Sequence, residues 1–261
     1  LWDEVRAYAL NGAVVTASGG RPVSIEFRRS GQELSCSMTP VKSDDGSYRA
    51  GIWVRDSSAG IGTLIYYNPS SDVFAGLGHA ICDVDTGSIM PLHSGEIVDV
   101  SITGVHKGES GAPGELRGSF TGSRTGELLI NSQVGIFGTG GQPSAGGDPV
   151  PLALRYEVVE GPATIRCTLD DSGPKEYAIN IEKVSIGENN PTKNMVIRVV
   201  DSELLAKTGG IVQGMSGSPI LQNGKLAGAV THVFVNDPTR GYGIFAENME
   251  KMSASVERGR E

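Results

Sequence analysis

The chain has 261 residues, a formal net charge of -8, 37 glycines and 13 prolines. This length allows two domains or one large β domain with an appendage, and the acidic balance excludes a basic nucleic-acid-binding surface. Three well-separated cysteines, Cys36, Cys82 and Cys167, argue against a zinc site and suggest buried thiols, and no run of about 18 apolar residues is long enough to cross a membrane.

The N-terminal part is predicted to form a helix followed by a hairpin. Apolar residues recur with helical spacing in segment 1–10, and Asn11-Gly12 is a typical helix end. Segments 23–27 and 34–38 alternate apolar and polar residues around a turn at 29–32. This order resembles the C-terminal half of a PDZ domain, which binds an extended peptide by strand addition. The glycine-rich loop that holds the peptide carboxylate in PDZ domains has no counterpart in this sequence.

After a linker at 40–46, short β-branched segments alternate with turns, and helical periodicity is rare. Strands are expected at 48–56, 63–67, 73–77, 97–103, 128–131, 152–160, 163–169, 176–184, 195–200, 218–221 and 226–235. Asn223-Gly224 is a strong hairpin signal, and 246–256 is expected to form a terminal helix. Segment 138–151 is the richest in Gly, Pro and Ser and is expected to connect two β units. Two sets of about six strands predict a mainly β fold of two packed barrels.

The segment Gly214-Met215-Ser216-Gly217 has the pattern of a turn that presents a nucleophile. Ser216 lies between glycines and is followed closely by an apolar run. The glycines allow the backbone N–H groups of Gly214 and Ser216 to turn inward, where they would stabilise an oxyanion. Met215 is expected to pack in the core. The alternative is a Gly/Ser-rich hairpin turn without chemistry.

A serine hydroxyl requires a base, most often a histidine, before it attacks a carbonyl at neutral pH. Of the four histidines, His93 and His106 fall in expected surface positions. His79 ends the first series of strands and precedes an apolar Ala-Ile pair. A buried structural histidine is the alternative, but the pairing with Ser216 favours a base. Base in the first β unit and nucleophile in the second is the arrangement of double-barrel peptidases.

Four segments together resemble the SpoIVB-type serine peptidases, the stage IV sporulation protein B family of spore-forming bacteria. These segments are 55–64, 78–79, 209–224, and 228–237 followed by 241–243. The resemblance covers nearly the whole chain. It implies a chymotrypsin-like double β-barrel peptidase domain at 43–261, with its units joined near 138–151, preceded by the half-PDZ at 1–42.

The resemblance also implies where such a protein acts and on what. The family's members are exported to the space between the forespore and mother-cell membranes. There they cleave a membrane-anchored regulatory subunit of a sporulation intramembrane-protease complex, and they process themselves. The resemblance thus implies protein substrates and no nucleic acid, and it allows a membrane anchor upstream of the first residue.

The family's pattern places the triad acid at Asp201, which keeps the chain order His, Asp, Ser. A carboxylate that ends an apolar strand lies at a barrel mouth, where a histidine partner can act on it. Alternatively, Asp201 is the N-cap of a helix, since Ser-Glu-Leu-Leu follows it. Three other carboxylates follow His79 and are rival acids: Asp83, Asp85 and Asp99.

The segment Thr231-His232-Val233 follows the nucleophile hairpin. In a double-barrel peptidase it would be the strand that pairs with the substrate backbone. His232 would then line the pocket for the side chain before the cut, or it is a hydrogen-bonded core histidine.

The leading interpretation is a serine endopeptidase that requires no metal or other cofactor. The alternative from another class is an inactive peptidase-like scaffold that binds peptides through its PDZ portion and signals in this way. A cysteine enzyme built on Cys82 is more remote, because Cys82 lacks the glycine turn that exposes a nucleophile.

Overall fold

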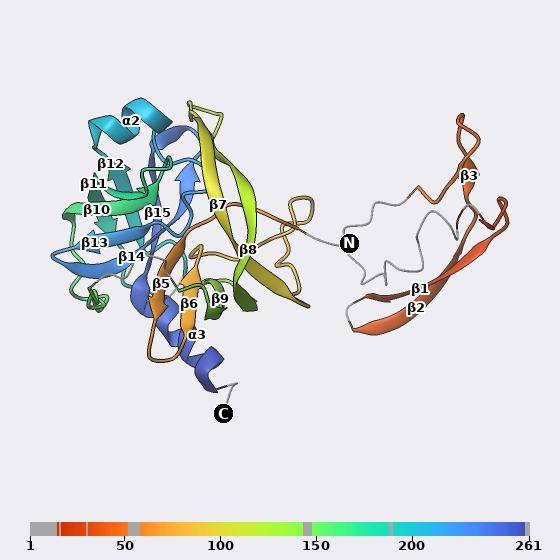
Figure 1. Ribbon diagram of the computed structural model, residues 1–261, viewed down its shortest axis with the longest axis horizontal. Coiled ribbons are helices and arrows are strands. Elements are labelled where there is room, and N and C mark those ends of the chain that lie inside the picture. The colour runs from red at the N-terminus through yellow and green to blue at the C-terminus, as the bar shows by residue number, and fades with distance from the viewer. Residues whose placement is uncertain are drawn as a thin grey trace. The chain divides into compact units, whose positions relative to one another are not determined.

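The computed structural model describes residues 15, 17–29, 31–51, 58–142, 148–187 and 190–258 (Figure 1). The chain divides into two compact units, Leu1–Ala59 and Gly60–Glu261. The predicted helix at 1–10 and most of the predicted strand at 48–56 lie outside the described residues. The predicted domain boundary at residue 42 and the PDZ resemblance stay predictions.

The described residues of the first unit form two antiparallel pairs of strands. Strand β1 (Val23–Arg29) pairs with β2 (Gln32–Met38), with Phe27 opposite Leu34, as the alternation predicts. Strands β3 (Val41–Lys42) and β4 (Tyr48–Arg49) form a short hairpin. Cys36 on β2 is exposed, as is Cys82 in the second unit, so the expectation of buried thiols is correct only for Cys167.

The second unit begins with a five-stranded antiparallel sheet in the order β5-β6-β9-β8-β7 (Figure 1). Its strands are β5 (Leu64–Asn68), β6 (Val73–Gly76), β7 (Gly95–His106), β8 (Glu115–Ser132) and β9 (Gly135–Gly140). The prediction missed β9, because half of that strand is glycine. A Cβ at Gly138 would lie 1.9 Å from the carbonyl oxygen of Glu127 on β8, so the close approach of these strands requires glycine there.

The second unit continues as a closed barrel in the order β10-β11-β12-β15-β14-β13. Its strands are β10 (Gly161–Thr168), β11 (Pro174–Val184), β12 (Met195–Val199), β13 (Pro219–Gln222), β14 (Lys225–Phe234) and β15 (Asp237–Phe245). Fully buried Ile165, Ile179, Ile197 and Ile220 fill its core. Five of the six strands predicted for this half are present, β15 was not predicted, and the first half has five strands among the described residues.

The predicted strand at 152–160 is wrong. Leu154, Tyr156 and Val159 are exposed, and the N–H of Glu157 donates to the carbonyl of Leu154 in a turn. The apolar residues of this segment therefore do not mark a strand with one buried face.

Two helices lie in the described part of the second unit. Helix α2 (Ser202–Thr208) follows β12, and α3 (Ala246–Arg258) follows β15. Helix α3 packs against β6 and β9 of the sheet and β14 of the barrel, with Met249 fully buried (Figure 1). It thus joins the two halves of the unit. No helix in the described ranges is long and apolar enough to cross a membrane.

Candidate active site

The turn that carries Ser216 lies against the five-stranded sheet. The N–H of Thr63 donates to the carbonyl of Ser216 at 2.9 Å, and the N–H of Gly217 donates to Val230 on β14 at 2.8 Å. A Cβ at Gly217 would lie 2.2 Å from the carbonyl oxygen of Thr63, and Gly217 has φ 89°. Only glycine meets both conditions, so the sequence pattern around Ser216 sets this close contact between the sheet and the barrel.

His79 is brought to the same place by a turn at the end of β6. Leu77 and Gly78 both have positive φ, at 63° and 70°, and the N–H of Gly78 donates to Gly76 at 2.8 Å. A positive φ is rare and strained at leucine, so tertiary contacts hold this turn. A Cβ at Gly78 would lie 3.0 Å from Cγ2 of Thr231 on β14. His79 and Ser216 are therefore both next to Thr231.

The contacts of His79 define which nitrogen is basic. Nδ1 lies 2.8 Å from the carbonyl oxygen of Ala80. A carbonyl only accepts, so Nδ1 carries the hydrogen and the lone pair lies on Nε2. The segment that follows is fixed by Asn131 on β8, which accepts from the N–H of Ile81 and donates to its carbonyl, both at 2.9 Å.

His232 lies beside His79, with ring centroids 4.9 Å apart and planes tilted by 39°. The residue as a whole is exposed, which does not fit the alternative of a core histidine, while neighbouring residues shield part of its ring from water. Loss of water around the ring, and then the charges of His79 and Lys193, lower the pKa of His232 to about 4. His232 is therefore neutral at neutral pH and places no fixed charge next to the proposed base.

Ser216 is half-buried, and its Oγ donates to the carbonyl of Thr231 at 3.1 Å. Thr231 is itself buried, and its Oγ1 donates to the carbonyl of Thr192 at 3.0 Å. The structure thus brings Ser216 together with the predicted substrate strand, Thr231-His232-Val233, and with His79 through that strand.

The backbone around Ser216 leaves two N–H groups available. The other seven N–H groups of segment 210–218 all have acceptors. In chain order, those of 210, 211, 212, 213, 215, 217 and 218 donate to Thr208 Oγ1, Pro238 O, Met215 Sδ, Gly114 O, Val212 O, Val230 O and Met215 O. Within the described part of the chain, the N–H groups of Gly214 and Ser216 have none. Met215 between them is fully buried, as predicted. An oxyanion site requires such unpaired donors close together on the chain.

Gly214→Ala is expected to lower kcat by about 10²- to 10³-fold, the effect of losing one oxyanion donor. Gly214 has φ 95°, and an added Cβ would lie 3.0 Å from the side chain of Leu116, so alanine must rotate the 214 peptide. The matched control is Gly224→Ala, at φ 74° in the β13–β14 turn, where an added Cβ meets nothing within 4 Å. Steady-state kinetics on a fluorogenic peptide measures both variants. An unchanged kcat in Gly214→Ala would show that the N–H of Gly214 does not stabilise the oxyanion.

Asp201 is the N-cap of α2. Its carboxylate accepts from the N–H of Leu204 at 3.0 Å and from that of Ala178 at 3.2 Å. The hydrogen bond from Leu204, followed by those from Ala178 and Glu203, lowers the pKa of Asp201. The described contacts therefore match the helix-capping alternative.

The register of the barrel also separates Asp201 from His79. His232 on β14 pairs with Tyr242 on β15, which pairs with Val196 on β12. Asp201 lies five residues beyond Val196, or about 16 Å along the strand direction. The triad role of Asp201 stays a prediction that no described contact supports.

Among the rival acids, Asp83 is buried and its Oδ1 accepts from the N–H groups of Asp85 and Thr86 and from Thr86 Oγ1. It organises its own loop. Asp85 and Asp99 are exposed. No cluster of three or more His, Cys, Asp and Glu suited to a metal ion lies in the described residues.

Asp201→Asn separates capping from catalysis. Asparagine is as good an N-cap as aspartate, so we expect kcat/KM within about threefold of the parent value. Asp201→Ala loses the cap and is expected to lower the free energy of unfolding by about 1 kcal/mol. Urea denaturation and peptide hydrolysis measure the two effects. A fall of about 10⁴-fold in the Asn variant, the effect expected for a triad acid, would show that Asp201 acts in catalysis as well as in capping.

The closed six-stranded barrel and the five-stranded half-barrel confirm the predicted mainly β fold of the chymotrypsin-like type. Solved structures of the Rv3671c protease are similar to this chain. The active form from M. tuberculosis is 14% identical, covers 97% of this chain and 87% of that chain, and has a TM-score of 0.41.

An inactive mutant form from M. tuberculosis is 13% identical over 99% of this chain and 97% of that one, with a TM-score of 0.38. Another inactive form is 17% identical over 54% and 72%, with a TM-score of 0.34. No curated protein sequence matches the chain. The family model of SpoIVB peptidase S55 matches residues 46–250, most of the chain. The chain therefore belongs to the SpoIVB peptidase family S55 and is a serine peptidase.

Proposed function

We propose that this peptidase is an endopeptidase with Ser216 as nucleophile and His79 as base. The observation that carries the proposal is the pair of N–H groups at Gly214 and Ser216 that have no acceptor in the described residues, on a turn next to His79. Thr231-His232-Val233 is the proposed substrate strand, and His232 is an exposed residue on it.

The proposed reaction begins when Ser216 Oγ turns from the carbonyl of Thr231 to Nε2 of His79. Nε2 takes the hydroxyl proton as Oγ bonds to the scissile carbonyl carbon, and the N–H groups of Gly214 and Ser216 stabilise the oxyanion. The imidazolium then gives its proton to the leaving amine as the C–N bond breaks. Water, deprotonated by His79, releases the acyl group and restores Ser216.

The carbonyl of Ala80 is proposed to stabilise the imidazolium through Nδ1–H, at the position where a triad carboxylate would act. It accepts from Nδ1 at 2.8 Å. A neutral acceptor stabilises positive charge less than a carboxylate does, so catalysis by His79 is expected to be slower than in a complete triad. Asp201 remains the family-based candidate for a third member, and Asp201→Asn tests it as described above.

Hydrolysis of a protein substrate tests the proposed activity against the scaffold alternative. The purified protein is incubated with labelled casein, with and without a sulfonyl fluoride or a chelator. We expect cleavage that the sulfonyl fluoride abolishes and the chelator leaves unchanged. Absence of cleavage, with retained binding of a peptide, would favour a scaffold. Cleavage that only the chelator blocks would contradict a serine mechanism.

The substrate and place of action are proposed from family membership alone. We propose cleavage of a membrane-anchored regulatory subunit of a sporulation intramembrane-protease complex, and self-processing, between the forespore and mother-cell membranes. Self-processing predicts a time-dependent fall in intact mass that a sulfonyl fluoride stops. Fractionation of sporulating cells tests the location, and a cytoplasmic protein would contradict it.

A further inference from the structure

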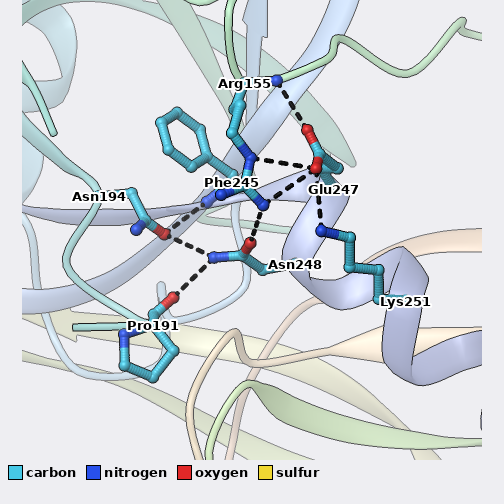
Figure 2. Close-up of polar contacts among 7 residues, drawn as sticks. All are labelled: Arg155, Pro191, Asn194, Phe245, Glu247, Asn248 and Lys251. Carbon is cyan, nitrogen blue, oxygen red and sulfur yellow. Dashed lines mark hydrogen bonds and ion pairs between the residues drawn. The ribbon is translucent and has the colours of Figure 1, made fainter. Parts of the chain in front are cut away.

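A buried polar network joins the segment before β10, the loop before β12 and the start of α3 (Figure 2). Arg155 and Glu247 form its centre. Arg155 donates through Nε to Glu247 Oε1 at 3.0 Å and through its backbone N–H to Oε2 at 2.9 Å. The side chains are 12% and 19% exposed, and Arg155 lowers the pKa of Glu247 to about 2. The pair is therefore charged and held in one geometry.

Asn248 extends this network to the loop at 190–194. Arg155 Nη2 donates to Oδ1 of Asn248 at 3.0 Å, which orients the amide so that Nδ2 faces the loop (Figure 2). Nδ2 donates to the carbonyl of Pro191 and to Oδ1 of Asn194, both at 3.0 Å. Asn194 is buried, and its Oδ1 also accepts from the N–H of Phe245. Asn248 therefore holds the loop on both sides of Thr192.

Thr192 connects the network to the active site. Its carbonyl accepts from Oγ1 of Thr231 at 3.0 Å, and the carbonyl of Thr231 accepts from Oγ of Ser216 at 3.1 Å. The same Thr231 contacts the turn that carries His79, through Cγ2. A shift of Thr192 would therefore move Thr231, which contacts both Ser216 and the turn that carries His79.

We propose that Asn248 is a positioning residue for catalysis, which acts through Thr192 and Thr231 to hold Ser216 and His79 in register. The inference rests on the proposed function of those two residues. Its physical basis is that a misplacement of about 1 Å in an active site costs on the order of 10²-fold in rate. Asn248 and Thr231 donate to neighbouring backbone carbonyls of one short loop, at Pro191 and Thr192, so loss of the Asn248 hydrogen bonds is expected to shift Thr231.

Asn248→Ala is expected to lower kcat by about 10- to 100-fold with KM within about threefold, because the substrate strand remains while the reacting groups lose register. Asn248→Asp keeps the size and the acceptor for Arg155 but removes both donations, and it provides the same test if the alanine variant does not fold. Lys251→Ala is the matched control. Lys251 contacts Glu247 at 3.1 Å from the same helix but is 65% exposed, and its removal is expected to leave kcat within twofold.

A double-mutant cycle distinguishes positioning from general stability. Thr231→Val removes the donation to Thr192 with little change in shape. If both residues act through Thr192, the double variant is expected to be clearly less impaired than the product of the two single effects. The kcat of each variant is measured without urea, and circular dichroism measures the folded fraction of each variant.

Three outcomes are decisive. A folded Asn248 variant with kcat within twofold of the parent value would overturn the inference, as would two effects that multiply in the double variant. A parent protein that hydrolyses no peptide and reacts with no serine-directed inhibitor would overturn the proposed function instead.

Discussion

Ser216→Ala is expected to lower kcat of peptide hydrolysis by about 10⁴- to 10⁶-fold while the protein stays folded. Loss of a nucleophile leaves only the contributions of the oxyanion site and of substrate binding, which together give about 10³- to 10⁴-fold over water. The only side-chain hydrogen bond shown for Ser216 among the described residues is the one to Thr231. Its loss is expected to change the free energy of unfolding by about 1 kcal/mol.

Ser218→Ala is the matched control for this prediction. Ser218 lies on the same turn, is fully buried, and its hydroxyl has no hydrogen-bond partner in the described residues. Removing a buried unsatisfied hydroxyl is expected to leave activity intact and to preserve or raise stability. A Ser216→Ala protein that cuts at the parent rate, or a loss of activity confined to Ser218→Ala, would contradict the assignment of the nucleophile.

His79→Ala is expected to have an effect of the same size, about 10⁴- to 10⁶-fold in kcat. Without Nε2 nothing takes the proton of Ser216 as it attacks, and nothing returns a proton to the leaving amine. His232 cannot replace it, because its pKa of about 4 makes it a weak base and its ring lies 4.9 Å from that of His79. Steady-state hydrolysis of a fluorogenic peptide measures the loss of kcat.

Substitutions of residues that act as a unit have non-additive effects on kcat, and this provides the control for His79. The double variant His79→Ala/Ser216→Ala is expected to be no slower than Ser216→Ala alone. His93→Ala, at an exposed loop position, is expected to keep the parent rate. A His79→Ala protein within tenfold of the parent kcat would show that another group acts as base.

The nucleophile turn could be predicted from the sequence because its geometry depends on local residue types. Gly214 and Gly217 have φ of 95° and 89°, and neither tolerates a Cβ without a close contact. Because the backbone conformation and the close contacts require glycine at these positions, the glycines in the sequence indicate that conformation directly. The hairpin at Asn223-Gly224 is similar, with positive φ at both residues, and so its strands were found close to their observed bounds.

Other elements depend on tertiary contacts, which the local sequence pattern does not indicate. Strand β9 is glycine-rich because its neighbour β8 approaches closely, and this pattern is also typical of a linker. The segment at 152–160 is rich in apolar residues, of which Ala153 and Val158 are buried and Leu154, Tyr156 and Val159 are exposed, so the pattern predicted a strand where tertiary structure forms a turn. Asp201 illustrates the same difficulty, because an aspartate between a strand and a helix suits both a triad acid and an N-cap.

Asn131 and Asn248 were not predicted at all. Each acts through a side-chain amide that reaches the backbone of a distant segment, 81 and 90 for Asn131 and 191 for Asn248. No spacing or motif marks such a residue. Only the folded arrangement shows that one fixes the segment after His79 and that the other holds the loop beside Thr231.

The most direct test of the account is the site at which a fluorophosphonate reacts. The protein is treated with the reagent, digested, and analysed by mass spectrometry, with His79→Ala treated in parallel. We predict a single adduct on Ser216 in the parent protein and a strongly reduced rate of labelling in His79→Ala. An adduct on another residue, or peptide hydrolysis by a protein whose Ser216 stays unlabelled, would contradict the central claim that Ser216 is the nucleophile activated by His79.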